Sequence, residues 1–518
     1  MAENLQTPGV YINEVSAFPN SVVAVPTAIP VFIGYTYRAD YRGKSYLQQA
    51  VQITSLNDFF TFFGVLDGSG PAATQPQPIY HAVPATSDGE LVIGGRSFNL
   101  CPDPGTLYYL YNSVRLFFEN GGGTAYVISV GLIGKPTGQP LPAGRPLVNP
   151  QVQYADLAAG LAIAMSVPDI TLIVAPDALL LDAANYATLL QAVLQQCGDL
   201  GSRMGLLDVY GGEAPNPNTF LALQGEIDAF RTAIGQSNLS YGAAYFPFLK
   251  TTIVQDSEIN YLNLGGAGEL AAILPNASVD PLKTILAQIA NPPANHPPTP
   301  TQSENALLIA SPDYQALHNR VLDKINTLPP SGAMAGIFTS VDNNDGVWKA
   351  PANVSLTSVF DTSLKITDTD QGGLNVDAAT GKSINSIRLF TGQGVLVWGA
   401  RTLDGNSQDW RYINVRRTLI MIEQSIKQAL QAYVFAPNVA ATWSLVQSMI
   451  SSFLTTIWQQ GGLVGPSAAS AFSVQIGLGT TMTADDLLNG ILKVNVLVAV
   501  THPAEFIVIA VSQKLQPA

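Results

Sequence analysis

The middle of the chain alternates between two patterns of apolar and polar positions. Segments with helical periodicity are separated by short β-prone apolar runs that are rich in Val, Ile, Leu and Met. The pattern predicts helices over 155–166, 183–197 and 220–234 and strands over 170–175, 204–210 and 241–246. Because strands and helices follow one another in turn, this region has the βαβ rhythm of an α/β layer.

Upstream and downstream of this layer, glycines and prolines punctuate the pattern. A helix is predicted over 114–123, where three glycines stop it, and a strand over 125–130. The stretches 67–105 and 134–150 are rich in Gly and Pro, so we interpret both as surface loops or linkers. Five prolines within 291–302 predict a stiff, exposed connection.

The last third of the chain changes character. Its first element is a helix over 413–433, with an apolar stripe at Val415, Leu419, Ile422, Ile426, Leu430 and Tyr433. An uncharged helix over 440–458 follows, and its polar interior favours packing within protein over insertion into a membrane. Runs at 472–476, 491–500 and 506–511 predict strands. The whole pattern therefore predicts an α+β fold that contains α/β layers.

The first 35 residues read as extended chain between prolines. A leader of this kind is a poor core element. It is either a frayed terminus or an arm that pairs with the sheet edge of another chain.

Composition narrows the classes of function. The chain has 518 residues, which predicts two to four domains, and 24 Lys and Arg against 37 Asp and Glu give a net charge of −13. This charge argues against binding of nucleic acid. Charged residues make up only 12% of the chain, which indicates a subunit with large contacts. Two distant cysteines and the lack of a secretory signal predict assembly in the cytoplasm.

The sequence motifs that would indicate catalysis are incomplete. Gly381-Lys382-Ser383 resembles the end of a phosphate loop, but Val376 stands where its first glycine should be. A Gly-x-Ser-x-Gly elbow is missing, the four histidines offer no metal pair, and 262–268 is too irregular for a dinucleotide fingerprint. Asp169, Asp177 and Asp182 suit helix capping better than catalysis. We therefore expect no catalytic, cofactor-binding or metal-binding residues, and no enzyme.

Several segments, in order along the chain, resemble the contractile tail sheath family of phage tails, pyocins, type VI secretion and extracellular injection systems. They are 7–14 (TPGVYINE), 117–122 (FFENGG), 346–353 (GVWKAPAN), 385–388 (NSIR), Gly392, Gly394, 398–403 (WGARTL), Arg416-Arg417, 462–465 (GLVG) and 503–507 (PAEFI). Residues 150–340 match the family only loosely.

The resemblance implies a multidomain structural subunit that stacks as hexameric rings around an inner tube and contracts to drive that tube through a target envelope. Its domains would be an amino-terminal arm (1–20), middle and outer domains (21–345, with a subdivision near 100–150), a core domain that lines the tube (346–502) and a carboxy-terminal arm (503–518). The partners would be further copies of the chain, the inner tube protein, and baseplate and terminator proteins. The alternatives are a rigid tube or shell protein and, more remotely, an α/β hydrolase.

In this family the arms add strands to the sheets of neighbouring subunits. The matching arm residues are Val10, Tyr11, Ile12, Glu14, Glu505, Phe506, Ile507 and Ile509. The acceptor strands would carry Phe472, Val474, Ile476, Val494, Val496 and Val498. Tyr11 and Ile12 have an alternative role in packing on their own subunit.

Two further groups of residues have more than one interpretation. The motif residues Asn385, Arg388, Gly392, Gly394, Trp398 and Arg401 suit internal ion pairs, core packing and a tight turn. A ligand role for Arg388, Arg401 and Trp398 is the less favoured alternative. Arg416, Arg417, Glu423 and Lys427 form either a solvated helix face or a weak electrostatic contact with the inner tube.

Overall fold

The computed structural model describes residues 21–65, 75–85, 89–144, 147–213 and 220–508, and the chain divides into two compact units. The large unit holds residues 26–417 together with the chain from His502 onward. The small unit holds residues 418–501 together with the chain up to Val25. The main hydrophobic core lies in the large unit, between Val31 and Ile413.

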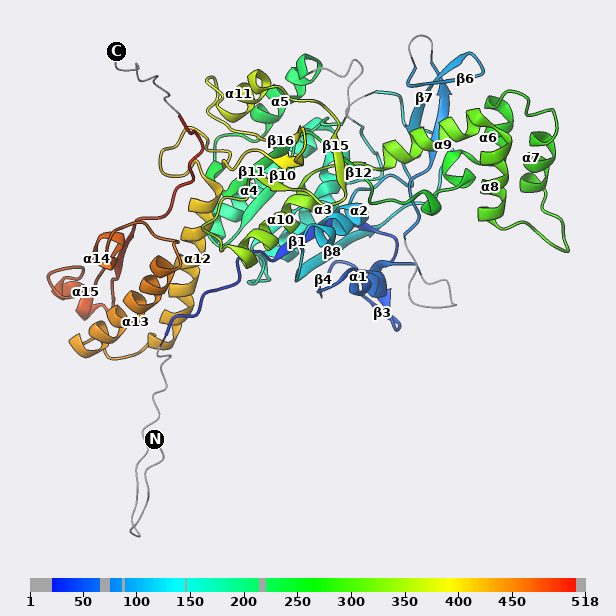
Figure 1. Cartoon of the computed structure of the whole chain (residues 1–518). Coiled ribbons are helices and arrows are strands. Elements are labelled where there is room, and N and C mark those ends of the chain that lie inside the picture. The colour runs from blue at the N-terminus through cyan, green and yellow to red at the C-terminus, as the bar shows by residue number, and fades with distance from the viewer. Residues whose placement is uncertain (1–20, 66–74, 86–88, 145–146, 214–219, 509–518) are drawn as a thin grey trace, which may run out of the picture. The chain divides into compact units, whose positions relative to one another are not determined.

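Within the described residues, nine strands of the large unit form one sheet, the large sheet (Figure 1). Its order is β14 (Val354–Ser355), β17 (Gly394–Val397), β16 (Asn385–Phe390), β11 (Gly242–Phe246), β10 (Met204–Asp208), β9 (Leu172–Val174), β1 (Pro30–Thr36), β8 (Ala125–Leu132) and β4 (Ala50–Ile53). The strands from β16 to β8 run parallel to their neighbours, and β4, β14 and β17 pair antiparallel. The central strands are buried along their length, as expected of parallel strands that are covered on both faces.

Helices cover both faces of the large sheet. Phe32 of β1 contacts Phe117 of α2 (Leu110–Glu119) with ring centroids 5.3 Å apart, and α10 (Ser331–Asn344) packs beside α2. The next residue, Ile33, approaches Gly160 of α3 (Tyr154–Met165), which packs beside α4 (Ala183–Leu200). Successive strand residues point to opposite faces, so α2 and α10 cover one face and α3 and α4 the other.

The structure confirms the α/β layer. The expected helices are α3, α4 and α5 (Gln224–Ala233, after a 3-10 turn over Phe220–Leu223), and the expected strands are β9, β10 and β11. The helix that was expected over 114–123 is α2, which begins earlier, at Leu110. It ends at Asn120 and is followed by Gly121 with a φ of +91°, a conformation that glycine adopts without strain.

The prediction that 67–105 is a loop is wrong for its second half. The structure has β5 (Tyr80–Pro84), β6 (Leu91–Ile93) and β7 (Arg96–Pro102) there, which pair in the order β5, β7, β6 among the described residues. Gly94 and Gly95, both with positive φ, form the tight turn between β6 and β7, and Pro84 and Pro102 end strands. The residues that suggested a loop therefore mark the ends of strands.

The rest of the large unit is mostly helical. Its helices are α1 (Leu56–Phe63), α6 (Gly266–Ile273), α7 (Leu282–Ala290), α8 (Pro300–Ala310), α9 (Pro312–Ile325) and α11 (Asp368–Asn375). Short strands β2 (Asp40–Tyr41) and β3 (Lys44–Ser45) pair with each other, and β12 (Leu249–Thr251) pairs with β13 (Thr327–Leu328) and β15 (Val359–Thr362). The expected connection over 291–302 ends early, because Thr299 caps α8 and Pro300 occupies its first turn.

The two units divide at Thr418, whereas the sequence placed a domain boundary at residue 346. The reason is strand pairing. β16 adds to the large sheet through Tyr245↔Asn385 and Phe246↔Ser386, and β14 and β17 extend the sheet from there. Residues 346–417 therefore complete the sheet that the middle of the chain begins.

The small unit begins inside α12 (Ile413–Leu430) and continues with α13 (Ala440–Gln459), α14 (Ala468–Ala471), β18 (Phe472–Gln475), α15 (Ala484–Leu488) and β19 (Asn495–Val498). α13 buries one face, which includes Val446, Ile450, Leu454 and Ile457, and exposes Ser448 and other polar residues on the opposite face. This amphipathic helix fits packing within protein. In the described part of the chain, none of the helices is long and apolar enough to cross a membrane.

Candidate assembly surfaces

The carboxyl edge of the parallel strands is where α/β enzymes commonly bind ligands. Here two buried carboxylates fill it. Asp177 follows β9 and accepts hydrogen bonds from the amides of Tyr35 (2.8 Å), Tyr109 (2.6 Å) and Leu110 (3.1 Å), at the start of α2. Asp208 ends β10 and accepts hydrogen bonds from the amide (2.7 Å) and hydroxyl (2.5 Å) of Ser331, at the start of α10. Both side chains hold helices in place.

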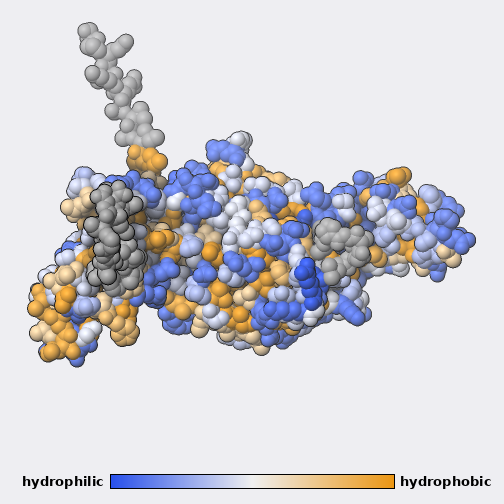
Figure 2. Space-filling view, turned by 90° about the horizontal axis from the view of Figure 1, so that it is seen from below, coloured by the Kyte–Doolittle hydropathy of each residue, from blue (hydrophilic) through white to orange (hydrophobic). Residues whose placement is uncertain are grey.

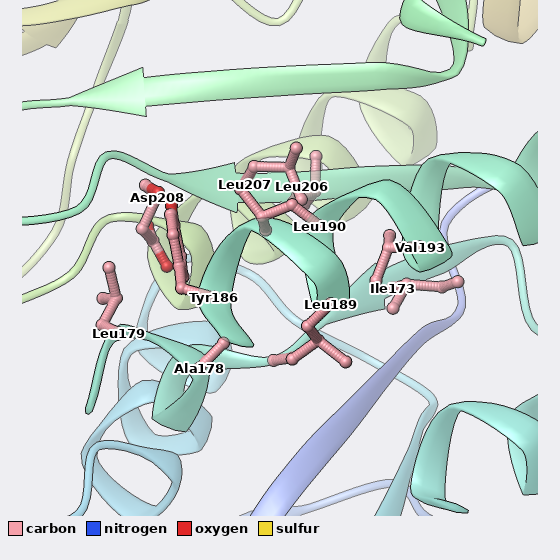
Figure 3. A pocket seen from close by; sticks show the side chains of 11 residues that line it. Ile173, Ala178, Leu179, Tyr186, Leu189, Leu190, Val193, Leu206, Leu207 and Asp208 are labelled. Carbon is pink, nitrogen blue, oxygen red and sulfur yellow. Dashed lines mark hydrogen bonds between the residues drawn. The ribbon is translucent and has the colours of Figure 1, made fainter. Parts of the chain in front are cut away.

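Burial dominates the titration of these two carboxylates. It raises the pKa of Asp177 to about 6, against the opposing effect of three backbone hydrogen bonds. It raises the pKa of Asp208 to about 7, against the two hydrogen bonds from Ser331. The cavity beside Asp208 and Tyr186 is lined by apolar side chains of α4, β9 and β10 (Figure 3) and has a volume of about 10 Å³. It has room for about one water molecule and none for a substrate.

The remaining candidate for chemistry, Lys382, is also structural. It is buried, and its ammonium group donates a hydrogen bond to the carbonyl of Arg231. Ser383 donates from its hydroxyl to the carbonyl of Asn375 (2.5 Å). Among the residues that the structure describes, no three His, Cys, Asp or Glu side chains are grouped so that they could hold a metal ion.

β18 and β19 form an antiparallel pair, the small sheet, with Phe472↔Val498 and Val474↔Val496 in register. In the described chain no third strand joins them. Both strands are shorter than expected: Ile476 lies just after the end of β18, and Val494 lies just before the start of β19. α13 packs against β18 and satisfies one carbonyl group, since Gln447 donates to the oxygen of Val474 (2.8 Å). A pair of four-residue strands is marginal by itself, so this sheet is suited to accept further strands.

Part of the surface of the small unit is apolar. Residues 428–484 contain no Asp, Glu, Lys or Arg. Leu497 of β19 is 63% exposed, Leu488 of α15 is exposed, and Phe435 is fully exposed between α12 and α13. Figure 2 shows apolar residues gathered on this unit. Such a patch on a monomer marks an interaction surface.

The expected arm residues have different outcomes. Val10, Tyr11, Ile12, Glu14 and Ile509 lie outside the described residues. Phe506 and Ile507 are 72% and 79% exposed and belong to no strand of the described chain.

Glu505 requires a correction. It was expected to pair with a neighbouring subunit, but it is held by its own chain, with its carboxylate against the guanidinium of Arg401 at 2.7 Å. Asn375 and Tyr412 also donate hydrogen bonds to it. The three partners lie 93 to 130 positions away in the sequence, so local pattern gave no signal for this site.

Arg388, Arg401 and the two glycines have contacts and backbone angles that fit the structural roles expected of them, whereas Trp398 does not fit. Arg388 pairs with Asp368 (2.8 Å), and Arg401 pairs with Glu505. Gly392 and Gly394, with φ of +78° and +83°, form the tight turn from β16 into β17. Trp398 is not a core residue, because it is half-exposed and packs on Phe390 with ring centroids 4.6 Å apart. Asn385 is buried, and its side chain hydrogen-bonds to the main chain of Arg401.

Arg416 and Arg417 do not lie on a solvated face, which corrects the expectation for these two residues. They are 5% and 4% exposed. The guanidinium of Arg417 pairs with Asp342 of α10 (2.5 Å) and lies over the ring of Phe338, and that of Arg416 lies over the rings of Tyr241 and Trp410. The first turn of α12 is thus enclosed within the large unit. Glu423 and Lys427, further along the helix, are exposed as expected.

The sequence is similar to known protein families and to known proteins. The profile of the phage tail sheath protein central domain matches residues 284–403, and that of the phage tail sheath C-terminal domain matches residues 406–514. The tail sheath protein of Vibrio phage KVP40 is 26% identical over 151 residues, which is 29% of this chain. That match spans only 22% of the relative's own length.

Solved structures extend the likeness to nearly the whole chain. The sheath complex of the extracellular contractile injection system PVC, in its contracted state, is 26% identical with a TM-score of 0.58, over 98% of this chain and 98% of that chain. The contracted helical sheath of the anti-feeding prophage is 27% identical with a TM-score of 0.58, over 98% and 99% of the two chains. Profiles, curated relatives and structures agree, and the chain belongs to the contractile tail sheath family.

Proposed function

We propose that the chain is the structural subunit of a contractile sheath, which stacks as hexameric rings around an inner tube and contracts to drive that tube through a target envelope. The observation that carries the proposal is the likeness over nearly the full length to two sheaths solved in contracted states. The unfinished small sheet and the apolar surface of its unit support it, because both suit a subunit that is completed by copies of itself.

The connections between subunits would be strands lent by the chain ends. The amino-terminal arm (1–20) and the tail from Phe506 onward would add strands to the small sheets of neighbouring copies. An added strand satisfies the free N–H and C=O groups of a sheet edge at roughly 1 kcal/mol net for each hydrogen bond. Apolar side chains such as Phe506 that become buried would add roughly 1.5 to 3 kcal/mol each. These connections are local, so subunits can turn as rigid bodies while the mesh stays connected.

Other roles follow from this assembly. The inner tube would contact the small unit, with Glu423 and Lys427 as its electrostatic contacts, and baseplate and terminator proteins would close the two ends of the sheath. The large unit would supply the outer and middle domains. Assembly would take place in the bacterial cytoplasm, as part of a phage tail or a phage tail-like particle.

Deletion of the amino-terminal arm tests the proposal. The full chain, coexpressed with its tube protein, should form extended tubes in negative-stain micrographs. A variant that lacks residues 1–15 should keep the unfolding midpoint of the full chain and form no extended sheath. Normal sheaths from the truncated chain would refute the exchange of this arm.

The same micrographs separate the alternatives. A rigid shell protein would never give a wider and shorter polymer after triggering, whereas a contractile sheath should. Insertion of a few residues after Ala17 should slacken the connection between subunits and leave more sheaths uncontracted. Normal contraction of that variant would show that the arm does not couple neighbours.

A further inference from the structure

The carboxylate of Glu505 is held by three side chains of its own large unit, an arrangement that we call the carboxylate clamp. Arg401 approaches it with Nε (2.9 Å to Oε1) and Nη2 (2.7 Å to Oε2). Asn375 Nδ2 donates to Oε1 (2.7 Å), and the hydroxyl of Tyr412 donates to Oε2 (3.1 Å). Forked pairing of arginine with a carboxylate is among the strongest and most directional polar contacts in proteins.

The environment keeps this carboxylate charged. Burial alone would raise the pKa of Glu505, but the hydrogen bonds from Arg401, Asn375 and Tyr412 and the charge of Arg401 together hold it below its ordinary value. The guanidinium of Arg401 is almost fully buried, and its Nη1 also donates to the carbonyl of Gly405 (3.1 Å). The clamp is therefore fixed from the arginine side as well.

Arg401 is joined in turn to the large sheet. Its amide donates to the side-chain oxygen of Asn385 (2.7 Å), and its carbonyl accepts a hydrogen bond from Asn385 Nδ2 (2.8 Å). The same amide group of Asn385, the first residue of β16, donates to the carbonyl of Ala244 in β11 (3.1 Å). A continuous set of hydrogen bonds thus runs from Glu505 to two neighbouring strands of the sheet.

The chain changes abruptly after the clamp. Val508, three residues beyond Glu505, is 92% exposed, and Phe506 and Ile507 are exposed as well. A charged, multiply bonded residue therefore directly precedes an apolar segment with little contact to the described chain. This order of features suits a fixed attachment point at Glu505, which we call the root, followed by a segment that pairs with another molecule.

We propose that the carboxylate clamp of Glu505 and Arg401 is the root of the exchanged tail, and that it passes the pull of a neighbouring copy through Asn385 to the large sheet of its own subunit. This inference rests on the proposed function. It makes Asn385 and Arg401 positioning residues for contraction, and it places the start of the exchanged segment at Phe506.

The first test measures the root in the unassembled subunit. Cys101 and Cys197 are buried, so a maleimide dye should label a V508C variant of the full chain selectively. E505Q removes the charge but keeps the size of the side chain, and it should lower the residual fluorescence anisotropy of the dye about two-fold. D368N is the matched control, since it neutralises the partner of Arg388 in the same unit and should leave the anisotropy unchanged. An unchanged anisotropy in E505Q would overturn the clamp.

The second test measures transmission in sheaths formed with the coexpressed tube. E505Q should lower the unfolding midpoint by no more than about 5 °C, because Gln keeps an acceptor oxygen for the buried guanidinium of Arg401. Its extended sheaths should contract at least five-fold less often than those of wild type or D368N after a mild chaotropic trigger. Normal contraction by E505Q with a mobile tail would overturn the transmission of force. Failure of the wild-type chain to form any sheath would instead refute the proposed function, and with it the transmission of force. The anisotropy measurement would still show whether Glu505 anchors the tail.

Discussion

The large sheet and the small sheet both contain apolar strand residues but reach opposite states. β1, β9, β10 and β11 of the large sheet are buried along their whole length, and helices cover both faces. In the small sheet the residues of β19 alternate between exposed and half-buried, and Leu497 is 63% exposed. One sheet is therefore completed by its own chain, and the other is left to be completed.

This difference shows that apolar content alone does not tell folding from assembly. In the large unit, the buried ionisable groups of Asp177, Asp208 and Arg417 are paired inside the chain. In the small unit the long uncharged stretch lies partly on the surface, where it can bind only another molecule. Substitutions in the large unit should therefore affect stability, and substitutions in the small unit should affect assembly.

The largest effect on stability is expected for Arg417→Ala. The variant leaves Asp342 buried without its ion-pair partner, which costs about 3 to 5 kcal/mol of unfolding free energy. The measurement is urea unfolding of the unassembled subunit. Arg388→Ala is the control, because its partner Asp368 is exposed and the loss should stay below about 1 kcal/mol. Equal losses in both variants would contradict the enclosure of the first turn of α12.

The second prediction concerns the pH dependence of stability that Asp208 causes. Its pKa of about 7 in the folded protein lies above the ordinary value of 3.8, so the folded state holds a proton that the unfolded state has released between these pH values. The stabilisation is complete below pH 4 and is lost as the pH rises through 7, at about 1 kcal/mol per pH unit. Asp208→Asn carries no such proton and keeps both contacts to Ser331. Its stability relative to wild type should therefore rise by roughly 3 kcal/mol from pH 4 to pH 7.

Asp182→Asn is the matched control for this pH series. Asp182 caps α4 but is exposed, and its backbone and side-chain hydrogen bonds lower the pKa of its carboxyl. Its contribution to stability should be present near neutral pH and disappear as the pH falls, which is the opposite sign. Unfolding midpoints at a series of pH values would measure both variants. A constant difference between wild type and Asp208→Asn would mean that Asp208 stays charged in the folded protein.

Sequence patterns predicted the centre of the large sheet well because burial on two faces leaves a strong local signal. β9, β10 and β11 are short apolar runs between helices, and each appears where it was expected. The strands β5, β6 and β7 were missed because Gly94, Gly95 and the neighbouring prolines give the signal of a turn. Local composition does not report that this turn joins two strands.

The errors in the candidate site have a different physical cause. The apolar stripe of α12 places Arg416 and Arg417 on the polar side of the helix, but the first turn of α12 is enclosed on every side. Glu505 was assigned to an exchanged arm, whereas its partner Arg401 lies 104 positions earlier in the chain. Periodicity describes one element at a time, so pairing between distant elements has to come from the structure.

Leu497→Lys tests the unfinished state of the small sheet. The side chain is 63% exposed, so the unfolding free energy of the subunit should change by less than about 0.5 kcal/mol. An added strand that covers Leu497 would bury the lysine, so the critical concentration for sheath assembly should rise about ten-fold, equivalent to about 1.4 kcal/mol. Sedimentation of polymer against subunit concentration measures this. Val92→Lys, on β6 and 59% exposed, is the control and should assemble normally.

The smallest effect on assembly is expected at Glu423 and Lys427. Of the four proposed tube contacts, these two are exposed in the described chain. Lys427→Glu should leave stability unchanged, because its side chain is exposed on α12. If the tube surface is negatively charged, opposite to Lys427, cosedimentation of tube with sheath should fall about two- to five-fold at 50 mM salt. The loss should vanish near 500 mM salt, because charges are then screened within a few ångströms. Glu423→Lys, one turn earlier, should change the same ratio in the opposite direction, because it adds positive charge to the same surface. Two variants with equal losses at both salt concentrations would indicate a steric effect, and no change in either would place the tube contact elsewhere on the small unit.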